Sequence, residues 1–172
     1  MAPAGRDERA WVQGARAGSA SDLEALFRAF WPRAFRAAYL VVHDAQAAED
    51  IAQESFLAAV RSLDRFDRRR PFGPWLHRIV VNRAIDHARA RKLRGETDLD
   101  ELHAAAPAPG TGLDGSIVAA LQALAPEHRA VIVLRHLLEY TPGEIAGLLD
   151  LPRGTVNSRL RRGLDALAEE LE

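Results

Sequence analysis

The sequence predicts an all-α protein, in which two small helical domains are joined by a flexible linker and the C-terminal domain is a helix-turn-helix. Apolar residues recur every three to four positions almost throughout the 172 residues, which is the spacing of amphipathic helices. No segment keeps the period-two alternation of a half-buried strand. Residues 95–115 interrupt the helical pattern with glycine, proline and acidic residues, as is typical of a linker.

The composition excludes several classes of protein. With 48% hydrophobic and 27% charged residues, the chain has the make-up of a folded globular protein. It contains no cysteine, so disulfides, thiolate nucleophiles and cysteine-bound zinc are excluded. No apolar run approaches the ~18 residues of a membrane span, and residues 1–20 lack the apolar segment of a secretory signal. We therefore expect a cytoplasmic protein without membrane insertion, in which residues 1–20 form an N-terminal tail.

Three amphipathic helices are expected in the first domain, residues 21–94. Ser21 is the expected N-cap of the first helix and opens a capping box, and Pro32 kinks or restarts that helix. Asp44 is the expected N-cap of the second helix. The third helix begins near Pro71, where the apolar spacing resumes.

The second domain, residues 116–172, contains the strongest local signal. Thr141 opens a short helix with a second capping box, and Asp150 stands at the following turn, where its side chain tolerates a left-handed backbone. A longer helix comes next, and its spacing predicts an inward apolar face made of Val156, Leu160, Leu164 and Leu167. A short helix, a tight turn and a longer helix form a helix-turn-helix.

The outward face of this longer helix is polar and basic. Residues 151–163 contain four arginines and no acidic residue. Arginine and asparagine can pair with base edges in the major groove, while serine, threonine and arginine hold phosphates. An ordinary helical hairpin with a solvated face is the alternative, but four unopposed arginines favour DNA binding. The predicted DNA-contacting residues are Arg153, Thr155, Asn157, Ser158, Arg161 and Arg162.

The charges are unevenly distributed along the chain. The formal net charge is only -1, yet residues 61–94 carry eleven basic and three acidic residues, while residues 95–115 carry five acidic residues and no basic one. Within the first block, residues 63–75 interleave arginines with phenylalanine and tryptophan. Single-stranded DNA binding requires this combination, because cations hold the backbone and rings hold unstacked bases.

Three motifs occur in order along the chain. Residues 49–56 read EDIAQESF, residues 75–82 read WLHRIVVN and residues 154–160 read GTVNSRL. With these motifs the sequence resembles an extracytoplasmic-function (ECF, group 4) RNA polymerase sigma factor of the sigma-70 family. The resemblance implies a region-2 domain over 21–94, an interdomain linker over 95–115 and a region-4 domain over 116–172.

The resemblance also implies the partners. The chain is expected to bind core RNA polymerase through the β′ clamp helices and the β subunit, and an anti-sigma factor is a further expected partner. The polar face of the second helix corresponds to the polymerase-docking face of the family. Acidic residues near a helix N-terminus are also favoured by the helix dipole, which leaves a structural reading open for Glu49. The expected docking residues are Glu49, Asp50, Gln53 and Glu54.

By the same resemblance, the region-2 domain recognises the -10 promoter element and helps melt it, and the region-4 domain recognises duplex DNA at the -35 element. In the family the loop before the third helix captures a flipped base. The segment Arg68-Arg69-Arg70-Pro71 departs from the family pattern, which leaves open the side chain that lines the base pocket. For Trp75 we favour core packing over base stacking. The expected -10 contacts are Arg65, Phe66, Arg68, Phe72, Trp75, Asn82, Arg83, Asp86 and Arg89.

Two other classes of function fit the sequence less well. A stand-alone helix-turn-helix transcription regulator with an N-terminal partner-binding domain explains the C-terminal half equally well, but leaves the acidic helix and the basic-aromatic loop unexplained. An enzyme is not expected, because the sequence has no glycine-rich phosphate loop, nucleophile elbow or metal-ligand cluster. The six histidines show no paired spacing, so we expect no metal and no cofactor.

Overall fold

The computed structural model describes residues 5–95 and 112–172, which contain helices and no strand. This confirms the all-α fold class, and most of the predicted linker, residues 96–111, lies outside the described residues. The first domain comprises α1 (Gly5–Arg16), α2 (Ala20–Val42), α3 (Ala45–Arg61), the 3₁₀ turn η1 (Leu63–Arg65) and α4 (Phe72–Leu93). The second comprises α5 (Gly115–Ala123), α6 (Pro126–Ile132), the π-helical turn η3 (Val133–Leu137), α7 (Pro142–Leu149) and α8 (Arg153–Leu171).

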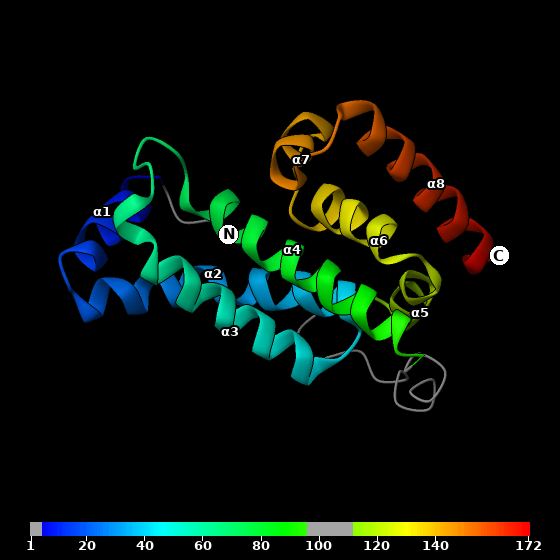
Figure 1. The fold of residues 1–172 in the computed structure, drawn as a ribbon, viewed down its shortest axis with the longest axis horizontal. Coiled ribbons are helices and arrows are strands. Elements are labelled where there is room, and N and C mark those ends of the chain that lie inside the picture. The colour runs from blue at the N-terminus through cyan, green and yellow to red at the C-terminus, as the bar shows by residue number, and fades with distance from the viewer. Residues whose placement is uncertain (1–4, 96–111) are drawn as a thin grey trace.

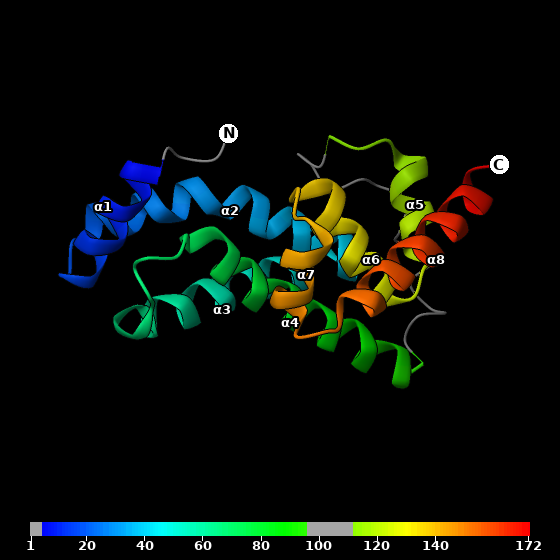
Figure 2. The ribbon, with the colours of Figure 1, turned by 90° about the horizontal axis from the view of Figure 1, so that it is seen from above.

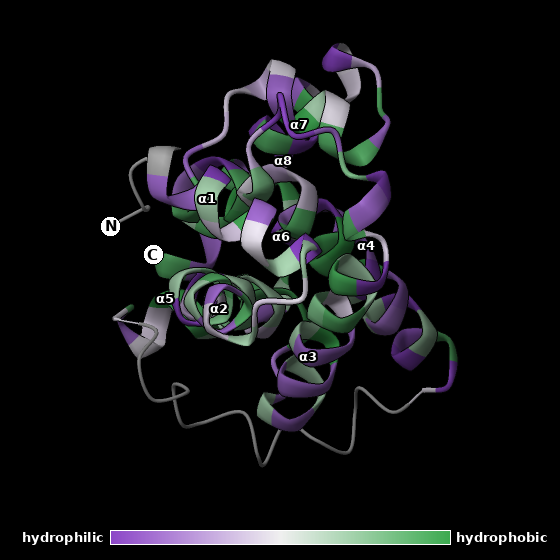
Figure 3. Cartoon of the chain, turned by 90° about the vertical axis from the view of Figure 1, so that its left-hand side faces the viewer, coloured by the Kyte–Doolittle hydropathy of each residue, from purple (hydrophilic) through white to green (hydrophobic). Residues whose placement is uncertain are grey.

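The helices α2, α3 and α4 pack against one another and form the body of the first domain (Figure 1). Their apolar faces meet in a core that includes Leu26, Leu40 and Val80, each at most 1% exposed. Asp44 caps α3 as predicted, because its carboxylate accepts a hydrogen bond of 2.9 Å from the backbone N–H of Ala47. Figure 3 shows hydrophilic residues on α3 at the outside of this bundle.

One expectation about α2 was wrong, and one of two alternatives for Pro32 is excluded. Its N-cap is Ser19 and not Ser21, since the hydroxyl of Ser19 accepts a hydrogen bond of 3.3 Å from the N–H of Asp22. Pro32 does not restart the helix, which continues through it to Val42. Phe27, Trp31 and Phe35 stack in a row across the proline, with ring centroids 4.8 and 6.3 Å apart. These contacts favour one continuous helix, because a break would separate the rings.

The segment expected to be an N-terminal tail contains the twelve-residue helix α1. Val12 of α1 is 3% exposed and belongs to the core. The helix approaches α2 so closely at Gly14 that an added Cβ would stand 1.8 Å from a carboxylate oxygen of Asp22. The first residues of the chain are therefore part of the first domain, which the sparse apolar content of this segment did not indicate.

The predicted helix-turn-helix is confirmed in α7 and α8. Thr141 and Glu144 form the expected capping box at the start of α7, and Asp150 adopts the left-handed conformation at φ 53°. The predicted inward face of α8 was wrong at Leu164, whose side chain is 41% exposed. Gly163 faces inward instead, and a Cβ there would stand 2.8 Å from Cδ1 of Ile132. Close packing of α6 against α8 therefore depends on this glycine.

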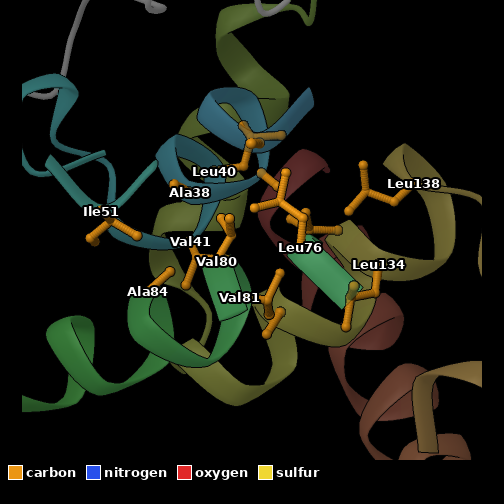
Figure 4. Close-up of a cluster of buried hydrophobic side chains, with 14 of the residues drawn as sticks. Ala38, Leu40, Val41, Ile51, Leu76, Val80, Val81, Ala84, Leu134 and Leu138 are labelled. Carbon is orange, nitrogen blue, oxygen red and sulfur yellow. The ribbon is translucent and has the colours of Figure 1, made fainter. Parts of the chain in front are cut away.

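The two domains pack against each other and share one hydrophobic core. Helices α6 and α7 lie against α4 in both ribbon views (Figures 1 and 2). Leu76 and Val81 of α4 join Leu134 and Leu138 of the second domain in one buried cluster (Figure 4). The sequence pattern separated the domains but did not predict this contact, because a core shared by two domains leaves no distinct period in either.

Buried polar contacts reinforce the packing between the domains. The guanidinium of Arg129 donates hydrogen bonds to the carbonyl oxygens of Val41 (2.5 Å) and Leu124 (3.0 Å), and burial lowers the pKa of Arg129 to about 10. Nδ1 of His77 lies 2.7 Å from the hydroxyl of Tyr140. Burial, with Arg33 nearby, lowers the pKa of His77 to about 4, so this histidine is neutral near pH 7.

Candidate nucleic-acid and polymerase interfaces

The first candidate interface is the N-terminal half of α8. The core side of this half is formed by Val156, which is fully buried, and Leu160, which is 9% exposed. All six residues predicted to contact DNA lie away from that core side, four of them exposed and two half-buried. They are Arg153, Thr155, Asn157, Ser158, Arg161 and Arg162.

The start of α8 is also suited to a phosphate group. No side chain caps this helix, whose N-cap is Pro152. The first N–H groups of a helix lack intrahelical partners and carry the positive end of the helix dipole. Arg153 and Thr155 stand beside these groups, in the geometry of an anion-binding helix N-terminus. The face of α8 thus carries groups that can hold phosphates at its start and groups that can pair with base edges one turn further along.

The second candidate interface is the loop between α3 and α4, and its predicted residues fall into two groups. Arg65 and Arg68 are exposed. Phe66 and Phe72 are 7% and 1% exposed, so neither presents a ring to solvent in this conformation, and their contact with DNA stays a prediction. Trp75 is half-buried and stacks on Phe66 with ring centroids 4.7 Å apart, which agrees with core packing.

The neighbouring arginines of this loop differ in their partners. The guanidinium of Arg69 forms two hydrogen bonds, of 3.0 and 3.1 Å, with the carboxylate of Asp67. These bonds lower the pKa of Asp67, so the carboxylate stays ionised at neutral pH. Arg70 lies 4.0 Å from the same carboxylate. Asp67 thus neutralises part of the loop, and Arg68 has no carboxylate partner among the described residues.

On α4, the predicted -10 contacts Asn82 and Asp86 are accessible to solvent. The two arginines of this group have carboxylate partners. Arg83 forms an ion pair of 3.0 Å with Glu54 of α3. Arg89 forms one of 2.5 Å with Glu127 of α6, and therefore contacts the second domain in this arrangement. A DNA phosphate at Arg89 would compete with that carboxylate for the guanidinium.

The third candidate interface is the outer face of α3. Glu49, Asp50, Gln53 and Glu54 are all exposed there, as expected for a docking surface. The amide of Gln46 donates a hydrogen bond of 3.2 Å to Asp50, and Arg83 holds Glu54. The sequence-based residue set did not include Leu57, which is 48% exposed and follows Gln53 and Glu54 by one helical turn on the same face.

Sequence reasoning also missed the residues whose polar contacts join the two domains. Glu127, Arg129 and Tyr140 form polar contacts with α4 or with the end of α2, and no spacing rule singles them out. Two negative findings limit the chemistry of the described residues. No group of three histidine or acidic side chains could hold a metal ion, and no helix there is long and apolar enough to cross a membrane.

Comparison with known proteins identifies the family of both domains. The family model described as Sigma-70 region 2 matches residues 26–94, and the one described as Sigma-70, region 4 matches residues 114–167. The ECF RNA polymerase sigma factor SigW of Bacillus subtilis is 33% identical over 153 residues, which cover 80% of this chain and 82% of SigW. SigL of Mycobacterium tuberculosis, also an ECF RNA polymerase sigma factor, is 34% identical over 175 residues, covering 94% of this chain and 95% of SigL.

A solved structure extends the similarity to the arrangement of the two domains. The structure of CnrH in complex with the cytosolic domain of CnrY matches with a TM-score of 0.72 at 26% identity, over 96% of this chain and 97% of the solved chain. Both regions of the family are therefore present, in order and in a known arrangement. The chain belongs to the sigma-70 family and is an RNA polymerase sigma factor of the ECF type.

Proposed function

We propose that the three candidate interfaces divide the work of a sigma factor among them. The outer face of α3 binds the β′ clamp helices of core polymerase, the loop before α4 and the exposed side of α4 bind the melted -10 element, and α8 reads the -35 element. The observation that supports this best is that an acidic face and two basic faces lie on separate elements of one chain. The factor is non-catalytic and acts in the cytoplasm, where polymerase and promoter DNA meet.

Charge supports the assignment of α3 to the polymerase. Glu49, Asp50 and Glu54 are acidic and exposed, whereas DNA is repelled by such a surface. Gln53 adds hydrogen-bonding capacity between them. A basic protein partner fits this face, and complementary charge raises the rate of association and fixes the register of docking.

For the -10 element, the exposed groups carry the proposal and the buried rings support them. Arg65, Arg68, Asn82 and Asp86 are accessible, and Phe66, Phe72 and Trp75 form an aromatic cluster where the loop meets the start of α4. Phe72 contacts both other rings, with centroid distances of 6.0 and 5.8 Å. We therefore assign these aromatic residues to positioning the loop, and the charged and amide side chains to contacting the strand.

We further propose that the two domains separate when the holoenzyme forms. The ion pair between Arg89 and Glu127 occupies a residue assigned to DNA, and two promoter elements must be contacted by two domains at once. An anti-sigma factor that binds the packed arrangement would prevent this separation. The CnrH chain, which this chain matches over 96% of its length, is bound to the cytosolic domain of CnrY.

The docking face is tested by charge reversal. Asp50→Arg with Glu54→Arg should abolish co-purification of the full chain with core polymerase while the helical circular dichroism signal is retained. The matched control is Glu169→Arg with Glu170→Arg, which reverses two exposed charges at the end of α8. Normal holoenzyme assembly by the α3 variant would show that this face is not the docking surface.

A stand-alone helix-turn-helix regulator is the alternative function, and it is not favoured. It gives no reason for the first domain to match region 2 over residues 26–94. The two functions differ in one requirement: a sigma factor starts transcription with core polymerase alone, whereas a regulator needs another sigma factor.

A further inference from the structure

Helix α1 holds the loop that joins α3 to α4 (residues 62–71) near both of its ends. Figure 1 shows α1 across the end of the α2–α4 bundle at which this loop lies. Near the first end, the guanidinium of Arg16 donates a hydrogen bond of 3.1 Å to the carbonyl oxygen of Asp64. At the second end, the carboxylate of Glu8 accepts a hydrogen bond from the backbone N–H of Phe72, the first residue of α4. Helix α1 lies outside every motif that indicated function.

The contact from Glu8 supplies a cap that α4 itself lacks. The N-cap of α4 is Pro71, and no side chain of the capping residue accepts a hydrogen bond from the helix. The first N–H groups of a helix have no partner within it. The carboxylate of Glu8 provides such a partner from another helix, and the helix dipole favours a negative charge at this end. Helix α1 therefore fixes the point at which the loop becomes α4.

Arg16 is suited to hold the loop and poorly suited to bind a phosphate. Its side chain is only 26% exposed. In addition to the hydrogen bond to the carbonyl oxygen of Asp64, its Nε lies 3.8 Å from the carboxylate of the same residue. A phosphate would have to displace both contacts, so the role of Arg16 is to fix the backbone of the loop.

The helix that makes these contacts is itself anchored to the body of the domain. Val12 of α1 is 3% exposed and belongs to the core, and Gly14 allows α1 to approach Asp22 of α2. Arg65 and Arg68, two of the predicted -10 contacts, are exposed and lie in the sequence between the two points that α1 holds. A binding segment that is ordered in advance loses less free energy on binding than one that must be ordered.

We propose that Glu8 and Arg16 are positioning residues for promoter binding. They do not contact DNA, and they hold the loop between α3 and α4 in the conformation in which Arg65 and Arg68 bind the -10 strand. A helix outside the region-2 match of residues 26–94 thus contributes to the strength of -10 binding. This inference rests on the proposed function, because it requires the loop to bind the melted -10 element.

The experiment uses holoenzyme assembled from the full chain and core polymerase. Single-stranded oligonucleotides are taken from the -10 regions of promoters at which this holoenzyme starts transcription, and affinity is measured by fluorescence anisotropy. Positioning and charge have opposite effects at Glu8, because loss of an acidic side chain near DNA should by itself strengthen binding. The control Asp7→Ala removes an exposed acidic side chain from the same helix and should not weaken binding.

Glu8→Ala should weaken binding of the -10 strand by about three- to tenfold, the effect of one lost hydrogen bond. Glu8→Gln, which keeps an acceptor oxygen, should bind within about twofold of the wild type. Arg16→Ala should weaken binding without changing its salt dependence, whereas loss of a phosphate contact would reduce the salt slope by about one. Binding to duplex -35 DNA should be the same for all these variants.

A measurement without DNA follows the contact itself. In the full chain without polymerase, hydrogen exchange of the Phe72 amide should be about tenfold faster in Glu8→Ala than in the wild type. The exchange rate of this amide should not change in Asp7→Ala, and the amides of α2 should keep their wild-type rates in both variants. Faster exchange throughout the chain would instead indicate general destabilisation.

Three results would overturn the inference and leave the proposed function intact. If Glu8→Ala binds the -10 strand as tightly as the wild type or more tightly, Glu8 does not position the loop. If Glu8→Ala weakens binding to the -10 strand and to duplex -35 DNA alike, its effect is a general loss of structure. If Arg16→Ala reduces the salt slope by about one, Arg16 contacts a phosphate. If wild-type holoenzyme does not prefer the single-stranded -10 sequence over its duplex, the proposed function of region 2 fails together with the inference.

Discussion

Helix α8 and the loop between α3 and α4 are both rich in arginine, yet the structure places their predicted residues differently. On α8 all six predicted residues are accessible to solvent. In the loop the arginines are exposed, while Phe66 of the loop and Phe72 at the start of α4 are buried. An α-helix has 3.6 residues per turn, so the residues of its buried face determine which residues lie on its exposed face. A loop has no such period, so the burial of the side chains in and beside it depends on neighbours in the tertiary structure. Phe30 is one such neighbour, with its ring centroid 5.2 Å from that of Phe72.

The largest expected difference is between substitutions of the aromatic residues around this loop and substitutions of its arginines. Phe72→Ala should lower the free energy of unfolding by ~3–5 kcal/mol, as expected for a fully buried phenylalanine. Arg68→Ala should change it by less than about 0.5 kcal/mol but weaken binding to the single-stranded -10 element. Urea unfolding and oligonucleotide binding measure the two effects. A stable Phe72→Ala protein that has lost DNA binding would return this ring to the DNA site.

The packing side of α8 can be tested at adjacent residues. Gly163→Ala puts a methyl group 2.8 Å from Cδ1 of Ile132, and overpacking of this kind costs ~1–3 kcal/mol. Leu164→Ala, at a side chain that is 41% exposed, should cost less than about 1 kcal/mol. Thermal unfolding of the two variants gives the order directly, and the reverse order would mean that α8 is rotated from the position described here.

The outward side of α8 should show two kinds of contact. Asn157→Ala or Arg161→Ala should cost ~1–3 kcal/mol and relax the preference at one position of the -35 element. Arg153→Ala and Thr155→Ala should weaken every sequence alike, and Arg153→Ala should reduce the salt slope by about one. The measurement is binding to single-base -35 variants at two salt concentrations. If no variant changes base preference, α8 holds DNA without reading it.

The buried His77, whose Nδ1 contacts the hydroxyl of Tyr140 across the two domains, should make the free energy of unfolding depend on pH. The pKa of His77 is about 4 in the folded chain and 6.5 when exposed, so the unfolded chain takes up the proton first as pH falls. The contribution of His77 to the free energy of unfolding is therefore complete above about pH 6.5. It is lost as the pH falls from 6.5 to 4, at up to ~1.4 kcal/mol per pH unit. The double variant His77→Phe, Tyr140→Phe should flatten that slope in urea unfolding.

The control for this pH dependence is replacement of the exposed His136, which removes a histidine without touching the interface. His43, whose pKa burial lowers to about 3, gives a slope of the same sign and remains in both proteins. The difference between the two slopes is thus due to His77. An unchanged slope in the double variant would show that His77 is not the buried neutral group described here.

Much of the fold was predictable because helices, their caps and their turns depend on residues that are close together in the sequence. The caps at Asp44 and Thr141 and the turn at Asp150 depend on neighbouring residues, and all three were predicted correctly. The N-cap of α2, the helix α1 and the inward position of Gly163 were missed. The helix α1 and the position of Gly163 depend on partners distant in sequence or on the absence of a side chain, which periodicity does not record. The N-cap was misplaced by two residues because Ser19 and Ser21 are both suitable capping residues.

The features of the candidate interfaces likewise include some that the sequence predicted and some that it did not. Motif order and helical spacing identified the surfaces of α3 and α8, where exposed residues lie at regular intervals. They could not show that Arg89 pairs with Glu127 across the two domains, or that α1 borders the loop between α3 and α4. Both features arise from packing between elements, and packing of this kind depends on three-dimensional neighbours that no local pattern specifies.

Run-off transcription with purified core polymerase tests the central claim most directly. The full chain should start transcription from genomic fragments without any other sigma factor, and the start sites should share a -35 and a -10 element. The variant with Asp50→Arg and Glu54→Arg should give no specific transcript. Specific transcripts from this variant would contradict the docking face on α3. If the wild-type chain produced transcripts only when a second sigma factor was added, the account of this protein as a sigma factor would be wrong.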